Sequence, residues 1–193
     1  MTPRLVALAD TPPVPWRNGG GLTRELLAWP DGGDWAVRVS VAEIEADGPF
    51  SAFPGVERWF AVLEGGGVAL TIAGTEHRCR AGDAALSFSG EAPVDCRLLH
   101  GPSRDLNLML RGGRGTMRQV VAGEAWAPSA PRCGLYALVA GRCRADATAT
   151  EVPADSLAWF DQAPVALSFH PGDPGDKRVS GWWLAAEAKE PAA

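Results

Sequence analysis

Residues 58–88 read RWFAVLEGGGVALTIAGTEHRCRAGDAALSF, and this stretch decides the fold. It contains short runs suited to β-strands at 58–64, 68–72, 76–80 and 84–88, and a glycine-containing turn separates each run from the next. Glycine lets the backbone reverse where a side chain would clash. Short strands joined by tight turns at this spacing predict a β-sandwich or barrel, and this order is typical of a double-sheet jelly roll.

The same rhythm continues on both sides of this stretch. Further strands are expected at 5–8, 22–29, 35–44, 94–100, 105–111, 117–121, 134–140, 156–160, 165–169 and 179–186. No segment shows a helical period over more than three turns. We therefore predict an all-β bicupin, with two stacked jelly-roll halves in one compact unit. The glycine-rich seam at 112–115 divides an N-terminal half with a ligand pocket, 1–115, from a smaller C-terminal half, 116–193.

The composition is that of an ordinary globular protein. The chain has 193 residues, of which 46% are hydrophobic and 21% charged, so a sizeable core is expected. The net charge of −5, with no basic run, argues against nucleic acid as a partner.

No apolar run is long enough for a membrane span, and the apolar stretch at the N-terminus is too short for a signal peptide. A cytoplasmic location with reduced, buried cysteines is expected, and a homodimer stays open.

Metal and nucleophile motifs are missing. Many cupins bind a metal through histidines two residues apart on the strand near Arg58, but positions 56–60 read VERWF. His77 and Cys79 share a strand face and supply only two ligands, and the remaining histidines are His100 and His170. No Gly-x-Ser-x-Gly elbow is present. The sequence therefore predicts no metal, no cofactor and no catalytic nucleophile.

Polar residues on otherwise apolar strands are the remaining candidates for a site. Asp105 and Asn107 share one face of 105–111, and leucines occupy the other face. A carboxylate and an amide inside a barrel need hydrogen-bond partners, which Arg38, Arg58 or a bound acid could supply. Two readings stay open: a ligand site, or a buried Arg–Asp pair without a ligand role. Arg38 and Ser40, which also share a face, point either into a cavity or to water.

The stretch WRNGGG at 16–21 also permits two interpretations. Its glycines provide either a tight entry into the strand at 22–29 or a rim that carries Trp16 and Asn18 to a ligand. Neither nucleotide-binding fingerprint fits, because no lysine-serine or lysine-threonine pair and no helix pattern follow the glycines.

Four sequence blocks resemble the HutD/Ves family. They are PWRNGGGLTRE at 15–25, WAVRVSVAE at 35–43, GPFSAFPGVER at 48–58 and DLNLMLR at 105–111, and they occur in the family's order. The resemblance implies a compact bicupin without the usual metal triad. Family members are often encoded with enzymes of histidine degradation. The implied role is to bind a small intermediate of that pathway, of the formylglutamate or urocanate class, and to temper its flux.

We expect a small anionic ligand in the N-terminal half. Planar guanidinium groups grip a carboxylate bidentately, so Arg38 and Arg58 are the expected anchors. Asn18 and Asn107 would orient a second polar group, while Glu43 or Asp105 would hold the arginines or accept a ligand N–H. The residues expected to bind the ligand are Trp16, Asn18, Gly19, Gly20, Arg24, Arg38, Ser40, Glu43, Arg58, Asp105 and Asn107.

The alternative function is a metal-independent cupin enzyme, an isomerase or a hydrolase, that uses Glu43 or Asp105 as its acid or base. A binding protein is favoured over the enzyme, because no histidine or metal is available and the carboxylates lack an obvious partner of opposite role. Turnover of histidine-pathway intermediates by the purified protein would discriminate the two.

Overall fold

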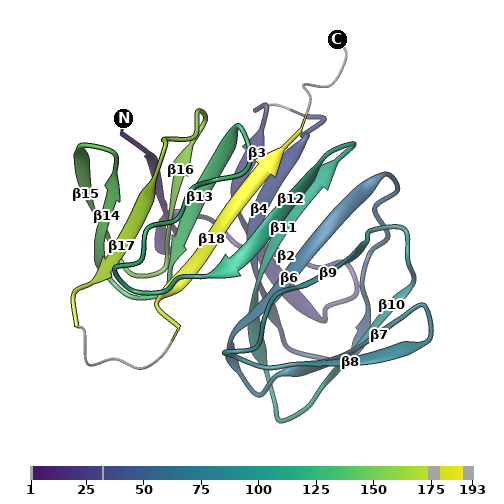
Figure 1. The fold of residues 1–193 in the computed structure, drawn as a ribbon. Coiled ribbons are helices and arrows are strands. Elements are labelled where there is room, and N and C mark those ends of the chain that lie inside the picture. Colours follow the sequence, from purple (N-terminus) through teal and green to yellow (C-terminus); the bar gives the residue numbers. More distant parts are fainter. Residues whose placement is uncertain (1, 32, 174–178, 189–193) are drawn as a thin grey trace. The chain divides into compact units, whose positions relative to one another are not determined.

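The computed structural model describes residues 2–31, 33–173 and 179–188 (Figure 1). Within these residues the regular structure is almost all β-strand, and the single helical element is the short 3₁₀ helix η1 (Leu8–Asp10). The chain forms two compact units. One comprises Pro12–Arg114, and the other combines the start of the chain, up to Thr11, with Gly115–Glu187.

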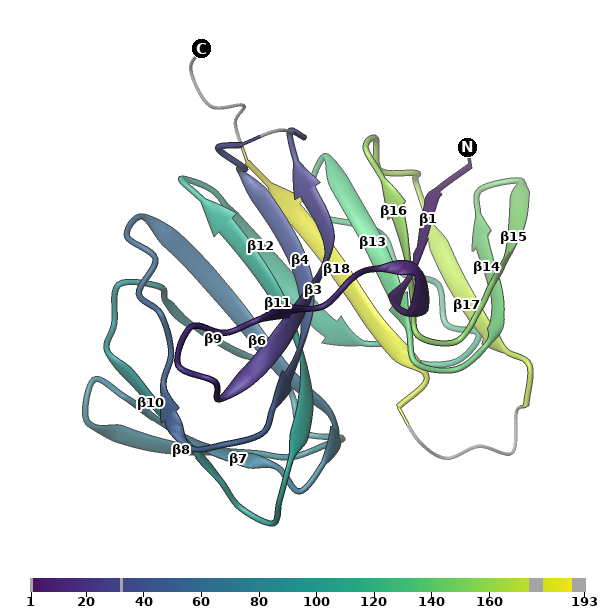
Figure 2. The ribbon, with the colours of Figure 1, turned by 180° about the vertical axis from the view of Figure 1, so that it is seen from behind.

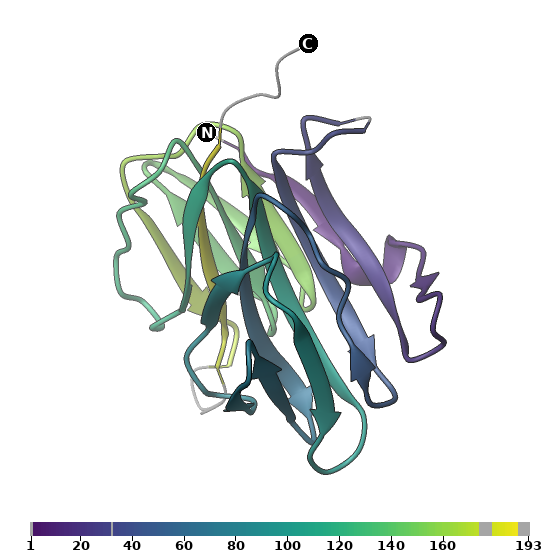
Figure 3. The same cartoon turned by 90° about the vertical axis from the view of Figure 1, so that its right-hand side faces the viewer.

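The unit built from Pro12–Arg114 contains two antiparallel sheets, as a jelly roll requires. In spatial order, the six-stranded sheet consists of β2 (Val14–Pro15), β3 (Gly21–Trp29), β4 (Val37–Ile44), β11 (Ser103–Arg111), β6 (Val56–Gly65) and β9 (Leu86–Ser89). The four-stranded sheet consists of β5 (Gly48–Pro49), β10 (Val94–Leu98), β7 (Val68–Ile72) and β8 (Thr75–Cys79). The long strands of the larger sheet lie side by side in Figures 2 and 3.

The register of β11 brings the polar residues of this unit together. β11 pairs with β4 on one side and with β6 on the other, so Met109 lies opposite both Arg38 and Arg58. Asn107 lies opposite Ser40, two residues further along the same face. Beyond these polar positions, a buried apolar cluster fills the space between the sheets. It includes Ile44, Phe60, Val62, Val68, Leu70, Val94 and Cys96.

The glycine-rich stretch forms the tight loop between β2 and β3. The Trp16 N–H donates to the Gly21 carbonyl, and the Gly19 N–H donates to the Trp16 carbonyl. Gly19 has φ +70°, a conformation that side chains disfavour. A Cβ on Gly21 would lie 2.2 Å from the Glu43 carbonyl oxygen on β4. Glycine at position 21 is therefore a steric requirement of the sheet.

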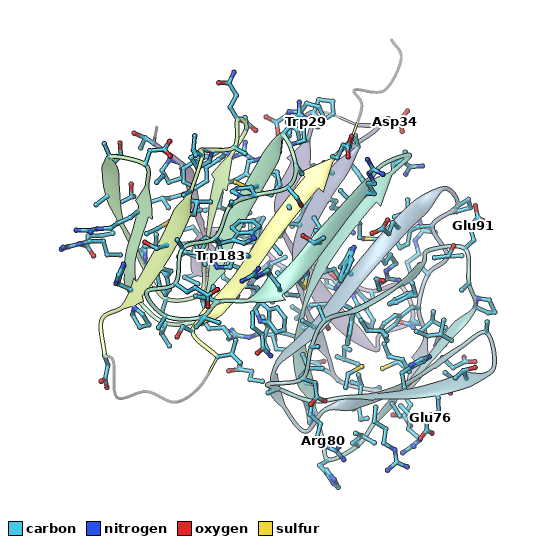
Figure 4. All side chains as sticks on the ribbon, viewed as in Figure 1. Trp29, Asp34, Glu76, Arg80, Glu91 and Trp183 are labelled. Carbon is cyan, nitrogen blue, oxygen red and sulfur yellow. The ribbon has the colours of Figure 1, made fainter. Side chains whose placement is uncertain are left out.

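The second unit repeats the two-sheet plan. In spatial order, its five-stranded sheet consists of β1 (Arg4–Ala7), β16 (Ser156–Phe160), β13 (Arg132–Ala137), β18 (Gly181–Glu187) and β12 (Arg114–Gln119). Its three-stranded sheet consists of β15 (Thr148–Val152), β14 (Gly141–Ala145) and β17 (Leu167–Pro171). Its buried core includes Trp183, which is labelled in Figure 4. Trp183 stacks on Trp126 at 4.9 Å between ring centroids.

Two features of the chain differ from the sequence-based expectation. The division at residue 115 assigned residues 1–11 to the N-terminal half, whereas β1 pairs with β16 along Arg4–Ala7 in the other unit (Figure 2). The β14–β15 hairpin was not expected at all. Its turn contains no glycine, and Asp146 takes the positive φ of 50° that glycine usually supplies.

Candidate functional site

A cavity of about 760 Å³ opens in the Pro12–Arg114 unit. Its wall combines the β2–β3 loop, one face of β3, β4, β11 and β6, and the segment that follows β5. Its volume lies in the range of small-molecule sites. The residues expected at a ligand site that line this cavity are Trp16, Asn18, Arg38, Ser40, Arg58, Asp105 and Asn107.

Three buried side chains form a hydrogen-bonded relay in the cavity wall. Arg58, which is 6% exposed, donates from Nη2 to Asn107 Oδ1 at 3.0 Å. Asn107 then donates from Nδ2 to Asp105 Oδ1 at 2.6 Å. The sequence left a direct Arg–Asp pair open, but Asn107 stands between the two charges. Arg58 Nε and Asp105 Oδ2 are buried and have no hydrogen-bond partner among the described residues.

Burial perturbs both charged ends of the relay. Removal from water raises the pKa of Asp105 from 3.8 to about 7, although Arg58 and the Asn107 hydrogen bond oppose this shift. Burial also lowers the pKa of Arg58 to about 10, with Asp105 opposing and Arg38 adding to the shift. Arg58 therefore stays cationic at neutral pH, whereas Asp105 titrates there.

Aromatic rings surround the Arg58 guanidinium. Its Cζ lies 5.2 Å from the centroid of Phe50, 5.7 Å from that of Phe53 and 5.1 Å from that of Phe88. Ring faces attract a cation electrostatically and partly compensate for its lost hydration. Phe50 and Phe53 also line the cavity, so they offer a ligand flat apolar walls next to the cation.

Arg38 is already engaged by the protein. Its Nε donates to Glu25 Oε2 at 2.6 Å, and its Nη1 approaches the Met109 sulfur at 3.7 Å. The pair is partly open to solvent, with side-chain exposures of 20% for Arg38 and 45% for Glu25. Arg38 does line a cavity, as one reading of its strand predicted. Its charge is partly neutralised there, which distinguishes it from Arg58.

The loop before β3 makes a tight entry into the strand and also forms part of the cavity wall. Trp16 and Asn18 line the cavity, while Gly19 and Gly20 do not and serve the turn instead. Asn18 Oδ1 accepts a hydrogen bond from the Gly20 N–H at 3.1 Å. Trp16 Nε1 donates to Thr23 Oγ1 at 2.7 Å, which fixes the indole at the cavity edge.

Arg24 and Glu43, which were also expected at the ligand site, lie outside the cavity. They form an ion pair with each other at 2.9 Å. The reason for their position is strand parity. Arg38, Ser40 and Ala42 line the cavity from β4, so Glu43 belongs to the opposite face.

Other lining residues were missed. Thr23 and Glu25 reach the cavity from β3, and Phe50 and Phe53 reach it from the segment after β5. The alternation of β3 contained the signal for Glu25, because Thr23 and Glu25 share a face when Arg24 occupies the other. A register shift between Glu25 and Leu27 breaks that pattern after Glu25.

Among the described residues that line the cavity there is no histidine or cysteine. The described part of the chain holds no cluster of three or more histidine, cysteine or acidic side chains suited to a metal ion. All four cysteines are free and buried, as expected, and burial raises their thiol pKa values, to about 11 for Cys79 and about 12 for Cys96. Across residues 2–31, 33–173 and 179–188, no helix has the length and apolar character to cross a membrane.

A family model described as HutD matches residues 8–172. The chain belongs to the HutD family. The resemblance inferred from the four sequence blocks is thereby confirmed. A 21.2 kDa protein in the hutC 3′ region of Pseudomonas putida is 42% identical over 110 residues, which are 55% of this chain and 57% of that protein. The match thus spans little more than half of that relative. Protein Ves of Citrobacter koseri is 36% identical over 128 residues, covering 65% of this chain and 67% of Ves.

Solved structures support the same fold. A conserved protein of Pseudomonas aeruginosa PAO1 (28% identity) and HutD from Pseudomonas fluorescens SBW25 in a formate condition (22% identity) each superpose with a TM-score of 0.82 over 96% of this chain and 98% of theirs. A cupin 2 conserved barrel domain protein from Leptotrichia buccalis, 12% identical, has a TM-score of 0.57 over 98% of both chains. The predicted all-β cupin fold is confirmed.

Proposed function

We propose that this HutD-family chain binds a small carboxylate in the cavity of its Pro12–Arg114 unit, without a metal. The observation that carries the proposal is the state of Arg58. Its guanidinium is buried in the cavity wall, is bound on one side to Asn107 and leaves Nε without an acceptor among the described residues. A buried cation needs paired oxygen acceptors, and a ligand carboxylate supplies two in the geometry of the guanidinium fork.

The ligand we propose is an intermediate of histidine degradation, of the formylglutamate or urocanate class, and the role we propose is to moderate that pathway. Membership of the HutD family supports this choice, as does the relative that lies in the hutC 3′ region of Pseudomonas putida. The cavity suits either class chemically. Phe50 and Phe53 provide walls for a planar ring, and Asn18 at the rim provides an amide for a second polar group.

A second candidate, the metal-independent enzyme, rests on Asp105 alone. A carboxyl whose pKa burial raises to about 7 can both take and give a proton at neutral pH. Glu43 drops out as its partner because it lies outside the cavity. Binding remains the preferred function, since Glu25, the other carboxylate of the cavity wall, is held in an ion pair with Arg38. Incubation of the candidate ligands with purified protein, followed by chromatography, distinguishes turnover from binding.

The test of binding is calorimetry with formylglutamate, urocanate, glutamate and histidine against the wild type, Arg58→Lys and Arg38→Ala. Lysine retains the charge but loses the fork, so Arg58→Lys should weaken carboxylate binding by roughly 10-fold or more. Arg38→Ala should have the smaller effect, because Glu25 already occupies Arg38. The matched control is Arg78→Lys, at an exposed arginine of β8 that pairs with Glu76. Glu76 is labelled in Figure 4.

Two outcomes would reject the assignment. If none of these acids binds the wild type, the cavity does not hold this class of ligand. If the acids bind Arg58→Lys as tightly as the wild type, Arg58 is a structural residue. Thermal unfolding of each variant shows whether a loss of binding comes from a loss of fold.

A further inference from the structure

Asp105 carries a buried oxygen that the protein leaves without a hydrogen bond. The residue is 1% exposed and lines the cavity. Its Oδ1 accepts from Asn107 Nδ2 at 2.6 Å, whereas Oδ2 has no partner among the described residues. A buried carboxylate oxygen without a donor costs free energy, so an acceptor retained at a cavity wall calls for a donor that enters the cavity.

None of the described residues donates a hydrogen bond to that oxygen. The Asn107 carbonyl oxygen accepts from Arg58, which fixes the orientation of the amide and directs its nitrogen to Asp105 Oδ1. Across the sheet, Asp105 lies opposite Ala42 on β4 and Val62 on β6, and both of these side chains are apolar. The relay therefore ends in two buried groups without a partner among the described residues, the Nε donor of Arg58 and the Oδ2 acceptor of Asp105.

We propose that Asp105 Oδ2 accepts a hydrogen bond from an N–H group of the ligand while Arg58 binds the ligand's carboxylate. This inference rests on the proposed function and narrows it. The ligand is a small carboxylate that also carries an N–H donor, separated from the carboxylate by a distance that spans the Asn107 side chain. A carboxylate of the same shape without an N–H leaves the buried acceptor unpaired and is rejected.

The acceptor role requires Asp105 in its charged form. Because the pKa of Asp105 is raised to about 7, lowering the pH from 8 to 6 protonates it and should weaken binding of an N–H ligand. The ionisable groups around it are Arg17, Glu25, Arg38 and Arg58 in the cavity wall, and the thiols of Cys79 and Cys96 on the opposite sheet. Both thiols stay protonated at these pH values.

The experiment compares two pairs of acids that differ only in N–H against O. The first pair is 3-(pyrrol-2-yl)acrylate and 3-(furan-2-yl)acrylate, and the second is N-acetylglutamate and 2-acetoxyglutarate. Calorimetry measures each acid with the wild type, Asp105→Asn and Asp95→Asn. Asparagine at position 105 keeps an oxygen for the Asn107 bond and replaces Oδ2 with a donor nitrogen. Asp95 is exposed on β10, so Asp95→Asn makes the same chemical change outside the cavity.

In at least one pair the wild type should prefer the N–H acid by about 10- to 100-fold at pH 8, the range of a hydrogen bond to a charged acceptor. Asp105→Asn should abolish or invert this preference, and Asp95→Asn should keep it. The preference should shrink in the wild type at pH 6, a measurement that needs no variant.

The inference is overturned if the wild type binds both acids of a pair equally well, or if its preference for the N–H acid survives in Asp105→Asn. Either result leaves the proposed function standing. Tighter binding at pH 6 than at pH 8 also overturns it, because Asp105 would then act as a donor to the ligand carboxylate. Failure of every acid to bind the wild type overturns the inference and the proposed function together.

Discussion

Replacement of Asp105 with asparagine should stabilise the folded chain at neutral pH and make little difference in acid. Asp105 is the buried end of the Arg58–Asn107–Asp105 relay, and burial raises its pKa from 3.8 to about 7. The folded chain therefore holds the Asp105 proton at pH values where the unfolded chain has released it. Asparagine occupies nearly the same volume and does not titrate. The variant therefore lacks the pH dependence of the free energy of unfolding that Asp105 causes.

The sign and size of the effect follow from proton linkage. The contribution of Asp105 to stability is complete below pH 3.8 and is lost as the pH rises through about 7. The difference of about three pKa units, at 1.36 kcal/mol each, corresponds to roughly 4 kcal/mol. The quantity to follow is the free energy of unfolding of Asp105→Asn minus that of the wild type. This difference should be about 4 kcal/mol larger at pH 8 than at pH 4.

The assay is urea unfolding at intervals between pH 4 and pH 8.5, followed by tryptophan fluorescence. Trp16 and Trp59 report on the unit that holds Asp105, while Trp126 and Trp183 report on the other unit. Other titrating groups are common to both proteins, so they cancel in the difference between variant and wild type. Asp95→Asn, at an exposed position, should give a difference that is flat across the same range.

A flat difference for Asp105→Asn would refute the reasoning, because it would mean that Asp105 titrates alike in the folded and unfolded chains. A difference that falls as the pH rises would refute it more strongly. In that case the folded state would favour the charged carboxylate, and a partner for Oδ2 would have to exist.

Three further predictions concern the loop, the rim and metals. Gly21→Ala should destabilise the Pro12–Arg114 unit by several kcal/mol, since its Cβ would lie 2.2 Å from the Glu43 carbonyl oxygen. Gly19→Asn should cost much less, because no atom lies within 4 Å of a Cβ at position 19 and asparagine accepts a positive φ better than most residues. Thermal unfolding measures both. Glu25→Gln should change the free energy of urea unfolding by less than about 1 kcal/mol, because the Arg38 pair is partly exposed. Dialysis against a chelator should leave carboxylate binding unchanged in calorimetry, and a loss of binding that one added metal restores would contradict this.

The fold could be predicted where its determinants are local. Glycine turns and two-residue alternation placed β6 to β9 within a few residues, because both signals act between neighbours in sequence. The partner of β1 could not be predicted in the same way. Its pairing with β16 joins residues about 150 positions apart, and no short-range signal specifies which sheet edge an N-terminal strand meets. The β14–β15 hairpin was missed because Asp146, not glycine, takes the left-handed turn position.

The site could be predicted where strand parity was applied and not where proximity in sequence replaced it. Asp105 and Asn107 share a face of β11 and both line the cavity. Glu43 was included because it follows Arg38 and Ser40, yet its odd position on β4 directs it to the other face. The pairing of Arg38 with Glu25 depends on a register between β3 and β4 that includes an irregularity, so alternation alone does not reveal it.

The relay explains why a carboxylate that destabilises the neutral folded chain can still be useful. Among the described residues, Asp105 Oδ2 is an acceptor without a donor, and Arg58 Nε is a donor without an acceptor. A ligand that satisfies both gains two charge-assisted hydrogen bonds to buried groups, where such bonds are strong. A ligand that satisfies only one leaves the other group buried and unpaired. Specificity would then come from the cost of leaving Arg58 or Asp105 buried and unpaired. The same cost at Asp105 lowers the stability of the folded chain at neutral pH when no ligand donor is present.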